Sequence, residues 1–236
     1  MKVIYRISDG SYIKNRFPFA TKRACLKNFL TVFNPSKEDL LIIADNVHEE
    51  TWRMINELHP HTVRTNICHG AGSWRYAAFE IALKEYPDHE IVYFVEDDYL
   101  HLPGSQEILL EGIALADYVS LYDHYDKYLS ADRGGPNPFI KYGGEVTRVI
   151  RTKSSHWKLT NSTTMTFATI VKVLREDQNI WAERTESRYP QDFQAFVQLA
   201  RKRRTLITPI PGYSTHCEPL WASPGLDWEK VARDFS

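Results

Sequence analysis

Ile91-Val92-Tyr93-Phe94-Val95-Glu96-Asp97-Asp98 is an apolar run that ends in three acids. Five consecutive apolar or aromatic residues are typical of a strand that is buried on both faces of a parallel sheet. Carboxylates cannot stay unpaired inside such a sheet, so we expect the three acids to emerge at the carboxyl end of the strand. Open α/β sheets bind ligands at that edge. The stretch therefore predicts a ligand-binding site beside Glu96, Asp97 and Asp98.

The three crowded negative charges need a cation or several hydrogen-bond donors to offset their repulsion. Mg²⁺ and Mn²⁺ prefer oxygen ligands and commonly join one or two carboxylates to a substrate diphosphate. The alternative is an acidic turn that only solvates the strand end. The stretch alone leaves both interpretations open, and the rest of the chain has to decide between them.

Length and composition indicate an ordinary folded protein. A chain of 236 residues can form one large α/β domain, and 43% hydrophobic with 25% charged residues excludes a disordered chain. The formal charge of −1 gives no general attraction to nucleic acid, so we expect no nucleic-acid partner.

The three cysteines and the chain start favour a cytoplasmic protein. Cys25, Cys68 and Cys217 are too few and too far apart for a disulfide framework, which fits a reducing compartment. Cys68-His69 and His216-Cys217 lack the usual spacing of zinc ligands. The chain begins without an apolar signal sequence and contains no run of membrane-spanning length.

The first hundred residues alternate strand and helix patterns, which predicts βαβ units and a largely parallel sheet. Strands are expected at residues 3–8, 40–44, 62–67 and 91–96, and helices after Thr21, around Trp52 and after Ser73. Ser73 is the expected N-cap of a helix. The apolar stripe of that helix has helical spacing and consists of Trp74, Ala77, Ala78, Ile81 and Ala82.

The second half is less regular. Helices are expected after Pro103, through residues 170–174 and after Asp192, with strands at 118–122, 163–168 and 206–210. Between them, residues 123–158 are rich in Gly, Pro, Tyr and charge. Long loops in compact domains tend to be functional.

The acidic triplet at the end of an α/β half resembles the short Asp-x-Asp motif of GT-A glycosyltransferases, here as Glu96-Asp97-Asp98. The resemblance is one of pattern over most of the chain. It implies a GT-A (Rossmann-like) single domain with a mostly parallel central sheet flanked by helices. A nucleotide-sugar half would span residues 1–100 and an acceptor half residues 101–236. Asp98 would hold Mn²⁺ or Mg²⁺, while Glu96 and Asp97 would face the ribose and base of the nucleotide.

Three more residues of the first half fit this plan. Asp9 and Asp45 each close a strand, where a carboxylate can accept from a base N–H or a ribose hydroxyl; as Asp9-Gly10 and Asp45-Asn46 they are also ordinary turn formers. Arg75 follows Gly70-Ala71-Gly72 in the first turn of a helix, where its guanidinium could reach diphosphate oxygens. An ordinary capped helix explains that segment equally well.

Asp192 and His216 complete the predicted site. On local sequence Asp192 is a helix N-cap, but the resemblance implies that it acts as the general base of an inverting enzyme. Helix N–H donors would lower its pKa, and Gln191 removes the neighbouring acid that relatives often have there. By the same resemblance His216 would be a second metal ligand, with Glu218 as a spare; a lone His is otherwise a hydrogen-bonded or surface residue.

The function implied is a metal-dependent, inverting glycosyltransferase that moves a sugar from a nucleotide-diphosphate sugar, with UDP favoured, to a glycan or lipid-linked acceptor. The Gln-x-x-Arg-Trp signature of processive synthases is absent, which favours single transfer. Residues 123–145 would order over the donor. Trp157, Thr163 and Thr164 are candidate acceptor contacts. Residues 201–204 are a basic helix end that is either exposed to solvent, where the helix dipole favours it, or in weak contact with a membrane surface.

Two other functions stay open. A nucleotidyltransferase can use a similar sheet and ion, but it typically has a Gly-rich basic loop after the first strand, where this chain has Asp9-Gly10-Ser11-Tyr12. A non-catalytic nucleotide or sugar-binding module could share the same sheet.

Overall fold

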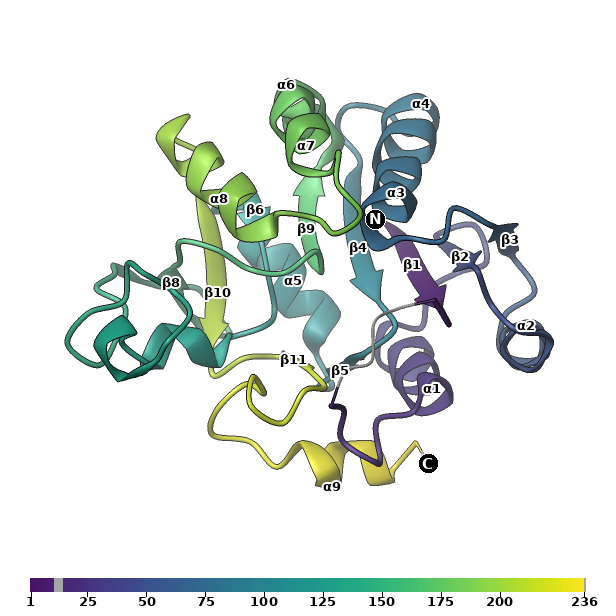
Figure 1. Cartoon of the computed structure of the whole chain (residues 1–236), viewed down its shortest axis with the longest axis horizontal. Coiled ribbons are helices and arrows are strands. Elements are labelled where there is room, and N and C mark those ends of the chain that lie inside the picture. The colour runs from purple at the N-terminus through teal and green to yellow at the C-terminus, as the bar shows by residue number, and fades with distance from the viewer. Residues whose placement is uncertain (11–14, 236) are drawn as a thin grey trace.

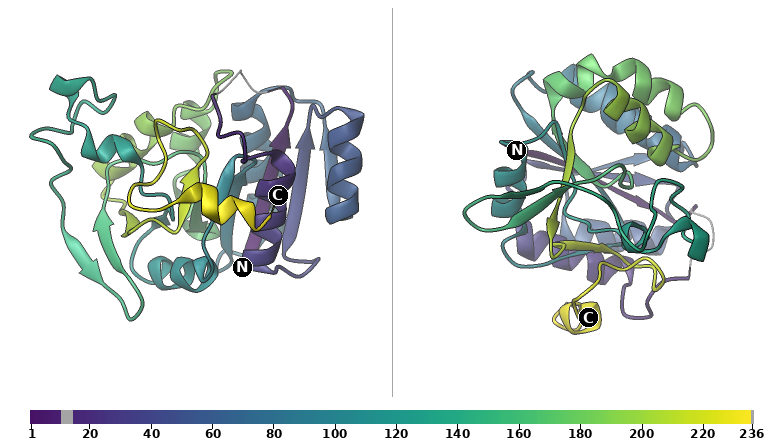
Figure 2. Two further views of the ribbon diagram at one scale, coloured as in Figure 1. Left: turned by 90° about the horizontal axis from the view of Figure 1, so that it is seen from below. Right: turned by 90° about the vertical axis from the view of Figure 1, so that its left-hand side faces the viewer.

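The computed structural model describes residues 1–10 and 15–235 and has three layers. A nine-stranded sheet lies between two layers of helices (Figures 1 and 2). The order of its strands is β3-β2-β1-β4-β9-β6-β10-β8-β7. The α/β class predicted from the alternating patterns is confirmed, with a sheet that is mixed rather than parallel throughout.

The strands that the first hundred residues build in this sheet are all parallel to one another. They are β1 (Lys2–Ser8), β2 (Leu40–Asp45), β3 (Thr62–Thr65) and β4 (Ile91–Glu96). The other strands are β6 (Tyr118–Val119), β7 (Val149–Arg151), β8 (His156–Leu159), β9 (Phe167–Ile170) and β10 (Leu206–Ile210). Strand β9 runs antiparallel to both β4 and β6, so it joins the parallel half to the irregular half.

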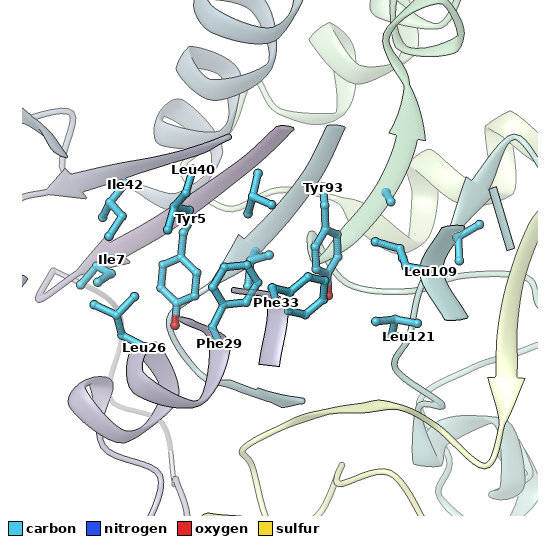
Figure 3. Close-up of a cluster of buried hydrophobic side chains, with 14 of the residues drawn as sticks. Tyr5, Ile7, Leu26, Phe29, Phe33, Leu40, Ile42, Tyr93, Leu109 and Leu121 are labelled. Carbon is cyan, nitrogen blue, oxygen red and sulfur yellow. The ribbon is translucent and has the colours of Figure 1, made fainter. Parts of the chain in front are cut away.

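Each face of the sheet has its own apolar core. One face is covered by α1 (Lys22–Phe33), α2 (Glu49–Leu58) and α5 (Ser105–Ile113), whose apolar side chains share one core with those of β1 and β4. Figure 3 shows part of this core, where Phe29 and Phe33 of α1 lie beside Tyr5 and Tyr93. The other is covered by α3 (Gly70–Arg75), η1 (Tyr76–Ala82), α4 (Leu83–Glu85), α6 (Val171–Glu176), α7 (Gln178–Arg184) and α8 (Asp192–Arg201). The stripe predicted after Ser73 is buried in this second core.

A second, two-stranded sheet lies beside the first and was not predicted. It pairs β5 (Tyr99–His101) with β11 (Ser214–His216), and α9 (Trp228–Arg233) packs nearby through Trp228. The pairing of His216 with Tyr99 brings the end of the chain next to the acidic triplet. None of the helices described is long and apolar enough to cross a membrane.

Three local predictions were wrong. The helix after β3 begins at Gly70 with His69 as its N-cap, where the His69 ring accepts from the Gly72 N–H, so Ser73 lies inside the helix. The expected strand at 163–168 begins only at Phe167. The segment 123–158 contains the hairpin β7–β8 and two short 3₁₀ turns, η2 (Tyr125–Tyr128) and η3 (Ala131–Arg133).

Candidate active site

A cavity of about 570 Å³ opens at the carboxyl end of β1 and β4. Its wall combines the two halves of the chain, because β1 and α3 supply one side and the segments before β9 and α8 supply the other. The lining residues are Arg6, Gly10, His69, Gly70, Glu96, Thr164, Met165, Arg188, Tyr189, Pro190, Asp192 and His216. The cavity lies at the edge that the acidic triplet predicted.

The three acids of the triplet have different surroundings. Glu96 faces the cavity. Asp97 is buried, and its Oδ2 accepts from the Ser8 N–H at 3.1 Å, which ties the end of β4 to β1. Asp98 is also buried, with Oδ2 3.1 Å from His216 Nε2. Tertiary structure thus assigns one acid to the cavity, one to the strand end and one to a contact with His216.

Arg16 contacts both buried acids. Its Nη2 lies 3.3 Å from Asp97 Oδ1 and 3.2 Å from Asp98 Oδ2. Lys22 adds a second positive charge, 2.6 Å from Asp9 Oδ1 and 4.0 Å from Asp97 Oδ2. Much of the repulsion among these carboxylates is therefore offset by side chains that the sequence pattern did not single out.

The Asp98–His216 pair meets part of the requirement for a divalent cation. A carboxylate oxygen and an imidazole nitrogen converge, and Glu218 Oε1 lies 3.7 Å from the same nitrogen. In the described part of the chain, however, no group of three or more His, Cys, Asp or Glu side chains forms a cation site. Mg²⁺ commonly keeps few protein ligands and takes the rest from substrate phosphates. The pair fits an ion of that kind, provided that Arg16 exchanges Asp98 for another partner.

Asp192 lines the cavity as the first residue of α8. Its Oδ1 accepts from the Phe193 N–H at 2.7 Å. Burial raises the pKa of the Asp192 carboxyl to about 6, the charge of Glu96 acts in the same direction, and the Phe193 hydrogen bond only partly opposes them. The expected helix N–H donor does lower this pKa, but burial outweighs its effect and the net shift is upward. The N-cap of α8 is Gln191, not Asp192 as expected.

Asp45 holds the fold together rather than facing a ligand. Its side chain is fully buried, and Oδ1 accepts from Thr65 Oγ1 at 2.9 Å and from the Ile67 N–H at 2.7 Å. The Cys68 N–H also donates to Oδ1, and the Ser73 hydroxyl donates to Oδ2 at 2.5 Å. With these four donors in place, the predicted contact with base or ribose is contradicted.

Asp9 lies at the end of β1 but turns toward α1 and α2. Lys22 Nζ donates to Oδ1 at 2.6 Å and the His48 N–H donates to Oδ2 at 2.8 Å. Burial raises the pKa of Asp9, but these two donors outweigh it and hold the pKa below its ordinary value. Asp9 lines a separate hollow of about 460 Å³. Ser11 and Tyr12 of the loop that follows lie outside the described residues.

Arg75 and Trp157 serve packing. The Arg75 guanidinium donates to the Ala182 carbonyl at 2.7 Å, and it lies over the Phe79 ring. This contact ties α3 to α7 and directs Arg75 away from the predicted diphosphate contact. Trp157 is fully buried in the core of the opposite face, so the predicted acceptor contact there is contradicted.

The two threonines before β9 differ. Thr164 lines the cavity and its hydroxyl is 2.5 Å from the Tyr99 hydroxyl. Thr163 is buried and donates to Ser120 Oγ at 2.8 Å. Only Thr164 is placed to touch a ligand.

Buried ion pairs hold the segment that was expected to order over a donor. Lys158 Nζ is 2.8 Å from Asp123 Oδ1 with both side chains almost fully buried. Lys127 Nζ contacts Asp126 at 3.0 Å and donates to Ser162 Oγ at 2.7 Å. The start of the 123–145 segment is therefore anchored to β8 and to the segment between β8 and β9.

The basic helix end at residues 201–204 is partly used in ion pairs. Lys202 Nζ lies 2.5 Å from Asp177 Oδ1, and Arg204 Nε lies 2.8 Å from Asp177 Oδ2. Asp177 also accepts from the Tyr118 hydroxyl at 2.8 Å. Two of the four cations thus support the fold, although Lys202 is exposed to solvent together with Arg201 and Arg203.

The two arginines that line the cavity were missed by the sequence patterns. Arg6 interrupts the apolar strand Val3-Ile4-Tyr5-Arg6-Ile7, and a charged residue inside a central strand was a signal that could have been used. Arg188 lies in the turn before α8 and carried no such signal.

No protein-family model and no curated protein matches the chain. Among solved structures, galactosyltransferase LgtC in complex with donor and acceptor sugar analogs aligns over 88% of this chain and 73% of its own, with 7% identity and a TM-score of 0.47. 4-Diphosphocytidyl-2C-methyl-D-erythritol synthase aligns over 98% and 99%, with 11% identity and a TM-score of 0.47. Mouse xyloside xylosyltransferase 1 aligns over 84% and 80%, with 10% identity and a TM-score of 0.39. Similarities this distant do not decide the chemistry, which has to come from the cavity.

Proposed function

We propose that the protein is a metal-dependent, inverting glycosyltransferase that uses a nucleotide-diphosphate sugar, with UDP favoured, and a glycan or lipid-linked acceptor. One observation carries the proposal: Glu96, Asp192 and His216 line one cavity at the carboxyl edge of the sheet, and His216 contacts Asp98. These are the residues that the resemblance to GT-A enzymes singled out for the donor, the base and the metal.

The reaction needs a base on the acceptor side of the cavity. The acceptor hydroxyl oxygen attacks the anomeric carbon of the donor sugar while the bond from that carbon to the diphosphate breaks. Asp192 takes the hydroxyl proton as the new bond forms. A pKa of about 6 leaves the Asp192 carboxylate mostly ionised near neutral pH, yet basic enough to accept a proton.

The leaving diphosphate carries the negative charge that develops as the bond breaks. Asp98 and His216 would hold Mn²⁺ or Mg²⁺, and such an ion neutralises leaving-group charge as a Lewis acid. Arg16 contacts Asp98 and lies close enough to the same edge to contribute positive charge. Glu96 lines the cavity and would accept from hydroxyl groups of the donor.

The test measures nucleotide release, by hydrolysis or sugar transfer, from a panel of nucleotide sugars, each with Mn²⁺ and with chelator. Metal-dependent release of the nucleoside diphosphate supports the proposal. Release of pyrophosphate from a nucleoside triphosphate would support a nucleotidyltransferase instead. Binding without turnover in every combination would support a non-catalytic module.

The variant that sharpens this test is Asp98→Asn, which removes the anionic ligand and keeps the side-chain volume. We expect it to lose metal-dependent turnover by at least about a hundredfold while it stays folded. Asp88→Asn is the matched control, because Asp88 is exposed and pairs with Arg175 away from the cavity. If Asp98→Asn keeps activity close to that of Asp88→Asn, the metal assignment is wrong.

A further inference from the structure

Arg6 is a charged residue in the centre of the parallel half of the sheet. Strand β1 lies between β2 and β4, and in its register Arg6 is opposite Ile43 on one side and Glu96 on the other. Side chains alternate along a strand, so Arg6 projects from the same face as Ile4, toward α3. Its side chain is only 13% exposed, and it lines the cavity.

The Arg6 guanidinium has almost no partner within the described residues. Its Nε is buried and makes no hydrogen bond to any residue that the structure describes. The nearest acid is Asp45, whose Oδ2 is 3.8 Å from Arg6 Nη2, beyond hydrogen-bond distance. Asp45 already accepts from four other donors. A buried guanidinium with unused donors is costly to the fold unless something else satisfies it.

Arg6 lies deeper than the acids that would hold the diphosphate. Its register partner Glu96 precedes Asp98 by two residues, and Asp98 follows the strand end. Behind Arg6 the wall is apolar, where Ile4, Trp74 and Phe94 enclose a small hollow of about 20 Å³. A donor whose phosphates sit at Asp98 would therefore direct its sugar, not its phosphates, toward Arg6.

We propose that Arg6 binds a carboxylate on the transferred sugar, so that the preferred donors are nucleotide sugars of the uronic acid class. The planar guanidinium fork matches a carboxylate with two parallel hydrogen bonds. Arg188 in the opposite wall adds a second positive charge to the same cavity. The inference rests on the proposed function, since it names the substrate class of that site.

The experiment compares donors that differ only at C6 of the sugar. Calorimetric titration in Mn²⁺ would use UDP-glucuronic acid against UDP-glucose, GDP-mannuronic acid against GDP-mannose, and free UDP and GDP. We expect the acidic member of at least one pair to bind about 10- to 100-fold more tightly, as expected for a charge-assisted bidentate contact. Arg6→Gln should remove that preference and leave affinity for the free nucleoside diphosphate within about threefold. Arg6→Lys should recover only part of it, because an ammonium lacks the fork.

Three results would contradict the inference, and they are separable. If the wild-type protein binds UDP or GDP but does not distinguish either pair, Arg6 does not select a carboxylate, and the proposed function survives. If Arg6→Gln weakens free UDP or GDP as much as the acidic sugar, Arg6 is a phosphate ligand. If neither the free nucleotides nor any nucleotide sugar binds, the proposed function itself fails.

A second variant tests, without any ligand, whether the charge of Arg6 is poorly satisfied within the fold. Arg6→Met keeps an unbranched side chain and removes the buried charge, so we expect the Tm of the ligand-free protein to stay level or rise. The same variant should lose the preference for the acidic donor. A clear drop in Tm would show that Arg6 serves the fold through Asp45, which would overturn the inference.

Discussion

Asp45 and Asp192 both lie near the carboxyl ends of the strands of the main sheet, yet their surroundings are opposite. Asp45 is fully buried and accepts from four donors on β3, the loop after it and α3. Asp192 lines the cavity and accepts one hydrogen bond from the residues described, from the Phe193 N–H. A fully buried carboxylate that accepts from four donors holds the surrounding segments together. A carboxylate with lone pairs left over, in a cavity that raises its pKa, can take a proton.

The largest expected effect is on catalysis at Asp192. Asp192→Asn removes the proposed base at constant shape, so we expect kcat to fall by about 10²- to 10⁴-fold. The Tm should not fall, because burial disfavours the charge that the substitution removes. Initial rates of nucleotide release and thermal unfolding of the same preparation check both parts. A variant with unchanged rate would show that Asp192 is not the base.

At Asp45 we expect an effect on stability rather than on catalysis. Asp45→Ala leaves two hydroxyls and two backbone N–H groups without their acceptor, so the free energy of unfolding should fall by about 3 kcal/mol or more. Urea denaturation measures this change. A loss below about 1 kcal/mol, together with lost nucleotide binding, would reverse the roles assigned to Asp45 and Asp192.

The pH dependence of kcat/KM is a further test of the role of Asp192 as the base. Because the pKa of Asp192 is raised to about 6, its carboxylate becomes protonated as the pH falls through that value. We expect kcat/KM to decrease about tenfold per pH unit below pH 6 and to level off above it. Residual activity of Asp192→Asn should lack this acid limb. A wild-type acid limb centred near pH 4 would mean that the base is an ordinary exposed carboxyl.

A loss of stability that depends on pH is expected at His101, a buried group that does not line the cavity. Burial lowers the pKa of His101 to about 3, and its Nε2 lies 2.8 Å from the Tyr93 hydroxyl. The folded protein therefore keeps His101 neutral while the unfolded chain binds a proton below about pH 6.5. Stability should fall between about pH 6.5 and 3, by up to about 1.4 kcal/mol per pH unit.

His101→Gln keeps a polar partner for Tyr93 and removes the titration. The slope of unfolding free energy against pH should be shallower in this variant over the same range. Equal slopes in the two proteins would show that other groups control acid unfolding.

The fold was largely predictable because its first half follows simple patterns. Buried strands such as residues 40–44 and the apolar stripe after Ser73 depend on local sequence, and both were confirmed. The hairpin β7–β8 was missed because its strands are short and partly exposed within a Gly- and Pro-rich segment. The sheet β5–β11 was missed because it pairs residues more than a hundred positions apart.

The candidate site was predictable for residues that the resemblance to GT-A enzymes assigned to it. It was not predictable where tertiary contacts decide which side chains meet. Glu96, Asp192 and His216 meet at one cavity, as expected, and His216 contacts Asp98. Asp45 and Arg75 were assigned to the nucleotide from position alone, but hydrogen bonds from neighbouring segments use them in the fold. Arg16 was overlooked, since nothing in local periodicity says which acids an arginine will meet. Arg6 was overlooked although it interrupts an apolar strand.

The most direct test is calorimetric titration of UDP and GDP into the wild-type protein and Asp98→Asn, each with Mn²⁺ and with chelator. The wild-type protein should bind at least one nucleotide at least about tenfold more tightly with Mn²⁺, and Asp98→Asn should lose that dependence. Equal nucleotide affinity with and without Mn²⁺ in the wild-type protein would contradict a cation-assisted phosphate site at Asp98 and His216.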